Sequence, residues 1–210
     1  MLLKLLPQML VDGLQLGFVY AIVALGYTMV YGVLHFINFA NAEIFMCGAF
    51  IGAEVLIALL GAAAGGGWTV FAFAVALLAA LVLTGLLGVF IERVAYRPLR
   101  SAPRLVPLIS AFGVSYFLQD FVRVAETFAH NSFYLTLPSI FKREFVLNEY
   151  TKVTVRAILI VGVCLAALAI LYTFIHRTKV GSAIRCVSQN QTMSALLGIH
   201  VNKTITTTFF

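Results

Sequence analysis

The sequence predicts an all-α, polytopic membrane protein with about five full transmembrane helices and the start of a sixth. The first observation is composition: 62% of the 210 residues are hydrophobic, 10% are charged and the mean hydropathy is +1.02. A soluble domain is nearer half apolar and a quarter charged. The second observation is three runs without Asp, Glu, Lys, Arg or His, at 13–34, 55–91 and 157–175. A helix needs about 20 apolar residues to cross a bilayer, so the sequence is dominated by membrane-spanning runs.

The glycine, proline and polar residues between these runs indicate where each crossing begins and ends. We place them at about Leu10–Tyr31, Ile37–Leu60, Thr69–Ile91, Leu105–Gln119 and Val153–Ile175. The glycine-rich stretch GAAAGGGW at 61–68 marks the turn between the second and third crossings. Pro98 and Pro103 prevent one continuous helix after the third crossing. A polar stretch at 124–152 follows the fourth crossing, and TITTTFF at 204–210 opens a further apolar segment.

The positive charges predict the orientation. The net charge is +6, and its bases gather in two short loops rather than on a nucleic-acid-binding face. They are Arg93, Arg97, Arg100 and Arg104 after the third crossing, and Arg177, Lys179, Arg185 and Lys203 after the fifth. Cytoplasmic loops are enriched in Lys and Arg, so we expect both loops in the cytoplasm and the N-terminus outside. A re-entrant hairpin near residues 33–43 would reverse the side of the N-terminus.

Catalytic patterns are missing from the sequence. It has no nucleophile–base arrangement, no phosphate-cradling glycine loop and no His/Cys cluster. Its three cysteines are scattered, which gives neither a disulfide framework nor metal-ligand spacing. We therefore expect a protein that is not an enzyme and has no catalytic residue, metal or cofactor of its own.

A polar cluster interrupts the apolar sequence at 32–50, GVLHFINFANAEIFMCGAF. Asn38, Asn41 and Glu43 lie within six positions of one another. An acidic side chain at mid-membrane costs about 2.5–3.5 kcal/mol on insertion scales, and irregular backbone survives there only where it is buried or lines a cavity. We expect a helix break or tight junction near residues 33–43, helped by Gly32. Two interpretations stay open: the cluster lines the translocation path, or it lies at the membrane edge between crossings.

A second candidate element is the basic loop at 181–199, GSAIRCVSQNQTMSALLGI. Its apolar residues have helical spacing, Ser182 is a suitable N-cap and Gly198 is a suitable end. The pattern predicts an amphipathic cytoplasmic helix that docks a partner. The alternative is a solvated helix at the membrane surface.

Three blocks of the sequence together resemble one family. GLQLGFVYAIVALGYTMVYGVLHFINFANAE, IERVAYRPLRSAPRLVPLISAFGVSYFLQ and GSAIRCVSQNQTMSALLGI are similar, in this order, to signatures of branched-chain amino acid ABC transporter permeases of the LivH type. The resemblance covers nearly the whole chain from Gly13. It implies a multi-pass subunit of the bacterial inner membrane in an ATP-driven importer. It also implies that the subunit works with a second permease subunit, two cytoplasmic ATPase subunits that bind the ATP, and a periplasmic substrate-binding protein.

The resemblance also implies site residues. The 181–199 segment would be the coupling loop that seats in a groove of the ATPase. Its residues that match the family pattern are Ala183, Arg185, Leu196, Leu197, Gly198 and Ile199. Where the family has His-Gly this chain has Asn41-Ala42, and where the family loop has Ala-Glu-Asp it has Ser188-Gln189-Asn190. The first change stiffens or shifts the expected break, and the second removes two negative charges from the ATPase contact.

The expected function is therefore a permease subunit for branched-chain or related amino acids. Such permeases are longer than this chain, so we expect 1–210 to be a single, truncated transmembrane domain. The alternatives are an importer of the same class for another small solute, such as urea or an amide, and a stand-alone channel or secondary carrier. A stand-alone carrier has no need of a docking segment at 181–199.

Overall fold

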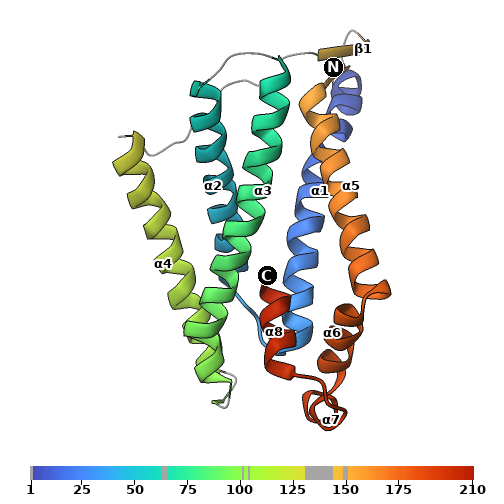
Figure 1. Ribbon diagram of the computed structural model, residues 1–210. Helices are drawn as coiled ribbons and strands as arrows, with labels where there is room; N and C mark the ends of the chain where they lie inside the picture. Colours follow the sequence, from blue (N-terminus) through green and yellow to red (C-terminus); the bar gives the residue numbers. More distant parts are fainter. Residues whose placement is uncertain (1, 63–65, 101, 104, 131–143, 149–150) are drawn as a thin grey trace. The chain divides into compact units, whose positions relative to one another are not determined.

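The computed structural model is a set of membrane-length helices joined by short elements (Figure 1). It describes residues 2–62, 66–100, 102–103, 105–130, 144–148 and 151–210. The long helices are α1 (Leu2–Leu34), α2 (Asn41–Ala62), α3 (Gly66–Ile91), α4 (Leu105–His130) and α5 (Val155–Arg177). The short helices are η1 (Glu92–Tyr96), η2 (Arg97–Leu99), α6 (Lys179–Gln189), α7 (Gln191–Leu196) and α8 (Val201–Phe209), and the strands are β1 (Glu144–Asn148) and β2 (Thr151–Thr154).

Five helices are long and apolar enough to cross a membrane, which confirms the predicted fold class. The predicted break near residues 33–43 is also confirmed, because α1 ends at Leu34 and α2 begins at Asn41. Three helix boundaries differ from the prediction by four residues or more. The helix of the first crossing begins at Leu2 rather than at Leu10, the second crossing begins at Asn41 rather than at Ile37, and the fourth continues to His130 rather than ending at Gln119. Part of the predicted turn at 61–68 lies outside the described residues.

The stretch at 124–152, expected as a polar loop, contains regular structure where it is described. Its first residues extend α4, and its end forms an antiparallel hairpin in which Glu144 pairs with Thr154 and Val146 with Lys152. Residues 131–143 lie outside the description. Short strands like these carry too little hydrophobic alternation to be recognised beside membrane helices.

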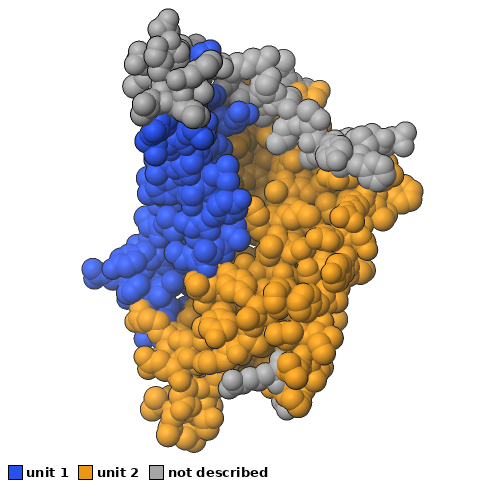
Figure 2. Space-filling model, turned by 180° about the vertical axis from the view of Figure 1, so that it is seen from behind, with its two compact units in different colours: residues 1–26, 139–182 blue, residues 27–138, 183–210 orange. Residues whose placement is uncertain are grey.

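The chain divides into two compact units, which Figure 2 shows in different colours. The first unit consists of residues 1–26 and 139–182, and the second of residues 27–138 and 183–210. Within the first unit, the backbone N–H of Lys152 in β2 donates to Oε1 of Gln8 in α1 at 2.8 Å. This bond ties the hairpin to the first helix.

Small residues set the helix packing inside the second unit. The helices α2 and α3 lie side by side (Figure 1). A Cβ atom built on Gly48 of α2 would lie 2.8 Å from Oγ1 of Thr84 in α3, and one on Gly52 would lie 3.4 Å from Cβ of Ala80. Close backbone approach through small residues is how helices associate in lipid, where burial of apolar surface gives no advantage.

The third crossing has an irregular end that brings α8 beside it. The π-helix η1 and the 3₁₀-helix η2 continue directly from α3, with Pro98 in the first turn of η2. The helix α8 runs back along this end: Phe210 lies against Gly85, Thr206 bonds Glu92, and Asn202 bonds Arg100. The end of α3 and the start of the last segment therefore form one packed structure in the second unit.

Candidate functional site

The first helix stops at a residue with left-handed backbone. His35 has φ +59° and its N–H donates to the carbonyl of Tyr31 at 2.8 Å, a common way to satisfy the end of a helix. Gly32, expected to help the turn, lies inside α1. His35 tolerates the left-handed region better than a β-branched residue would, and the break begins within the predicted range of 33–43.

Asn38 organises the junction between α1 and α2. It is 2% exposed, and its Oδ1 accepts both the N–H of Ala40, at 3.1 Å, and the hydroxyl of Tyr96 in η1, at 2.7 Å. The first bond is a local Asx-type turn that directs the chain into α2. The second joins this turn to the end of the third crossing. Among the described residues, Nδ2 of Asn38 has no hydrogen-bond partner.

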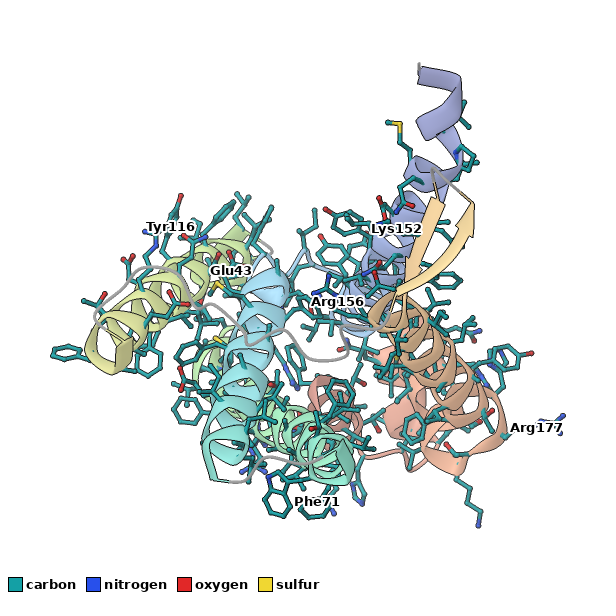
Figure 3. All side chains as sticks on the ribbon, turned by 90° about the horizontal axis from the view of Figure 1, so that it is seen from above. Glu43, Phe71, Tyr116, Lys152, Arg156 and Arg177 are labelled. Carbon is teal, nitrogen blue, oxygen red and sulfur yellow. The ribbon has the colours of Figure 1, made fainter. Side chains whose placement is uncertain are left out.

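Glu43 faces a different neighbour. It lies in the first turn of α2, where the positive end of the helix dipole favours a carboxylate. Its Oε1 accepts from Nε2 of Gln119 in α4 at 3.2 Å, while its buried Oε2 has no partner among the described residues. Figure 3 shows Glu43 at the side of α2 that faces α4. A second tie between these segments is the stacked pair Phe39–Phe112, with ring centroids 4.1 Å apart.

The three polar residues predicted from the sequence therefore do not form one site. Asn38 joins the junction to η1, Glu43 joins α2 to α4, and Asn41 is the half-exposed first residue of α2. Asn38 is buried in the structure, and its role in a translocation path stays a prediction. The role of Asn41 and Glu43 in that path stays a prediction as well.

A buried ion pair between Glu92 and Arg100, which the sequence analysis did not predict, lies at the end of the third crossing. Glu92 is completely buried and accepts from Nη2 of Arg100 and from Oγ1 of Thr206, the latter at 2.9 Å. Nη1 of Arg100 also donates to Oδ1 of Asn202 at 2.8 Å. Desolvation by burial lowers the pKa of Arg100, and the charge of Glu92 acts in the opposite direction. This pair, with Asn202 and Thr206, holds η1 and η2 to α8.

One feature of the sequence points to this pair. Glu92 stands between a long apolar run and the four arginines that we interpreted as topology-setting charge. An acid at the end of such a run needs a partner, because a buried carboxylate without one is costly. Spacing alone does not identify Arg100, since the irregular turns of η1 and η2 bring together residues that a regular helix would separate.

The coupling loop was predicted at 181–199, and its residues 183–199 are called the coupling segment from this point. They belong to two helices, α6 and α7, rather than to the predicted one. Asn190 ends α6 and caps α7, because its Oδ1 accepts from the N–H of Met193 at 3.0 Å. The predicted cap Ser182 lies inside α6, which begins at Lys179. Thr178 serves that end instead, since its Oγ1 accepts from the N–H of Gly181 at 3.0 Å. An Asn at the centre of a helical pattern favours caps and turns, which explains the break.

The apolar residues of the coupling segment differ in exposure. Ile184 and Val187 in α6 are buried, whereas Leu196 and Leu197 at the end of α7 are 77% and 79% exposed. The helix α7 ends at Leu196, and Gly198, the predicted end residue, follows with φ +83°. The other family-matching residues are the half-buried Ala183 and Ile199 and the exposed Arg185. Two exposed leucines outside the membrane-length helices form a small apolar tip.

The coupling segment also contacts the junction directly. Nε2 of Gln191, the first residue of α7, donates to the carbonyl of Val33 at the end of α1 at 2.8 Å. Val33 is buried, and its carbonyl belongs to the last turn of a helix, where partners from the helix itself run out. A shift of α7 would therefore act on the break between the first two crossings.

The described residues provide nothing that resembles a metal centre: no three His, Cys, Asp or Glu side chains group closely enough to hold an ion. The site is instead a broken helix whose polar groups are partly paired, joined to a helical segment that presents leucines to solvent. Together with the five candidate spans, this arrangement is that of a polytopic membrane protein.

Comparison with known proteins identifies the family. The family described as branched-chain amino acid transport system / permease component matches residues 9–210. The high-affinity branched-chain amino acid transport system permease protein LivH of Escherichia coli strain K12 is 37% identical over 207 residues, covering 96% of this chain and 65% of the relative. BraD of Pseudomonas aeruginosa, of the same description, is 39% identical over 208 residues with the same coverage. LivH of Salmonella typhimurium is 36% identical over 207 residues.

The chain belongs to this family of branched-chain amino acid transport permeases, and its relatives are permeases rather than enzymes. It spans 65% of the length of these curated relatives. No solved structure matches it. With five candidate spans, it is a multi-pass protein of the cell inner membrane.

Proposed function

We propose that the protein is a permease subunit of an ATP-driven importer for branched-chain amino acids. In this role it forms part of the translocation path and receives force from cytoplasmic ATPase subunits, which bind the ATP. It works with a second permease subunit and a periplasmic binding protein that delivers the substrate. The observation that carries the proposal is the family membership over residues 9–210, and the geometry of the coupling segment supports it.

The coupling segment supplies the physical basis for ATPase contact. Exposed leucines on a short capped helix favour insertion into an apolar groove of a partner. The bond from Gln191 to Val33 then transmits movement of α7 to the junction between α1 and α2. Because the structure holds the junction by a few side-chain bonds, movement there would change how the first two crossings meet.

The docking step is tested by changing the exposed tip. Leu197→Asp places a charge in the proposed contact, and Thr192→Asp adds the same charge to an exposed position of the same helix. We expect Leu197→Asp to lose co-purification with the cognate ATPase subunit, while Thr192→Asp retains it. Equal retention by both variants would overturn the docking assignment. Circular dichroism and size-exclusion profiles that match the unchanged protein show that folding is intact.

The substrate class is tested in the assembled transporter with all of its subunits. We expect leucine, isoleucine and valine to compete with one another for uptake, and urea and amides not to compete. Failure of the three amino acids to compete would contradict the substrate class while leaving ATPase docking intact. Uptake that continues after the ATPase is removed would instead favour a stand-alone carrier.

A further inference from the structure

A basic cleft opens between the end of the third crossing and α8, within the second unit. It has a volume of about 600 Å³, and three of its lining side chains are the bases Arg93, Arg97 and Lys203. Its other walls include Val89 and Phe210, which are apolar, and the hydroxyl-bearing Thr207. The cleft is separate from the junction and from the exposed leucines of the coupling segment.

The charges of this cleft lack a counterion in the described part of the chain. All three bases are exposed, and none forms an ion pair with a described carboxylate. Glu92 is close in sequence to Arg93, but its oxygens are taken by Arg100 and Thr206 in the buried pair. Three cations therefore converge on one cavity, an arrangement that attracts an anion from outside the chain.

The lining of the cleft changes from charged to apolar along the axis of the spanning helix. Arg93 and Arg97 lie in the last turns of the span at 67–99, and Val89 lies one turn deeper. Because α8 runs back along α3, Lys203 near its start lies at the basic end, whereas Phe210 lies against Gly85 at the deeper, apolar end. A ligand that fits this gradient carries a negative group at the interface and hydrocarbon below it.

We propose that this cleft binds the phosphate group of an anionic phospholipid. Basic pockets between membrane helices at the cytoplasmic side hold anionic headgroups, and both arginines present planar donors suited to phosphate oxygens. Val89 and Phe210 receive the upper part of the acyl chain. A bound lipid would offset part of the positive charge of the three bases and fill the space between η1 and α8.

The test measures lipid binding by native mass spectrometry of the purified chain in a neutral detergent. The probes are phosphatidylglycerol, phosphatidylcholine and glycerophosphoglycerol, which is the headgroup without acyl chains. The test variant is Arg93→Gln/Arg97→Gln/Lys203→Gln. The control variant, Arg156→Gln/Arg177→Gln/Lys179→Gln, removes the same charge from exposed bases outside the cleft. Arg156 and Arg177 lie at the two ends of α5 (Figure 3).

We expect phosphatidylglycerol affinity to fall about fivefold for each cleft base removed, from a surface contribution of about 1 kcal/mol per base. The control variant should keep the affinity of the unchanged chain. Equal losses in both variants, or no loss in the cleft variant, would overturn the site. If glycerophosphoglycerol competes as strongly as the lipid, the ligand is a soluble phosphate and the lipid assignment fails. If phosphatidylcholine binds equally well, the proposal that the cleft recognises negative charge is wrong.

Discussion

A membrane protein usually keeps apolar residues in its spans and polar residues outside them, and two regions of the second unit differ from this pattern in opposite ways. Around the junction and η1, polar side chains are buried among membrane helices, and Asn38 and Glu92 are 2% and 0% exposed. In the coupling segment, the apolar Leu196 and Leu197 are exposed outside the spans. In the first region Asn38 and Glu92 form hydrogen bonds inside the chain, whereas in the second the two leucines leave apolar surface uncovered.

The difference separates structural from docking roles. Buried polar groups that are hydrogen-bonded hold irregular backbone in place, and their removal changes stability first. Exposed apolar residues contribute little to folding, so their removal changes association first. Gln191 joins the two regions through the carbonyl of Val33. The following variants test this separation, beginning with the largest expected effect.

The first variant is Arg100→Gln, which leaves Glu92 buried without its cation. Removing one partner of a buried ion pair costs about 3–5 kcal/mol. We expect the free energy of unfolding, measured by titration with a denaturing detergent, to fall by about this amount. Arg97→Gln is the matched control, since Arg97 is exposed and makes no ion pair with a described residue, and it should change stability by less than about 0.5 kcal/mol.

The double variant Glu92→Gln/Arg100→Gln sharpens this test. It removes both charges, so it should be more stable than Arg100→Gln alone. If Arg100→Gln is no less stable than Arg97→Gln, the ion pair does not hold η1 to α8. The buried polar groups of the first region would then not have the stabilising role assigned to them.

The second variant is Gly181→Ala, in the first turn of α6. A Cβ atom here would collide with the backbone carbonyls of Phe174 and Ile175, which are not free to move. We expect a loss of about 1–3 kcal/mol in stability, together with weaker ATPase co-purification because the turn from α5 into α6 must shift. Gly162→Ala in α5 meets nothing within 4 Å and should be neutral or slightly stabilising. An unchanged Gly181→Ala protein would show that the turn adapts.

The third variant is Tyr96→Phe, which removes the hydroxyl that donates to Asn38 at 2.7 Å. The ring keeps its edge-on contact with Phe36, and Asn38 keeps its bond to Ala40. We therefore expect a loss of about 1 kcal/mol, read in the same unfolding titration. Tyr116→Phe, on an exposed tyrosine of α4, should lose nothing. A Tyr96→Phe loss no greater than this control would mean that the bond to η1 does not stabilise the junction.

The sequence predicted the spans and the break because both depend on local patterns. Charge-free runs identify helices long enough to cross, and a polar cluster inside one identifies an interruption. It did not predict that His35 takes a left-handed backbone conformation at the start of the break. The residue types of a short stretch predict that a turn occurs more reliably than they predict which residue adopts the left-handed conformation.

The hydrogen-bond partners of the buried polar groups could not be predicted from the sequence, for a different reason. Glu92 meets Thr206 and Asn38 meets Tyr96 across long stretches of chain, and these contacts depend on how α8 and η1 pack. Similarly, the split of the coupling segment at Asn190 depends on its side chain capping α7 rather than continuing a helix. Apolar spacing predicts which face is buried, but long-range pairing is set by tertiary packing.

The smallest effect on stability is expected from Glu43→Gln, which addresses the role of that carboxylate. The amide oxygen of the new side chain can still accept from Gln119, so the 3.2 Å contact survives and stability should change by less than about 1 kcal/mol. If Glu43 serves the translocation path, uptake by the assembled transporter should fall severalfold while folding and ATPase co-purification persist. Glu126→Gln, near the end of α4, is the control and should leave uptake unchanged. Normal uptake by Glu43→Gln would place Glu43 with Asn38, as a residue that holds the junction.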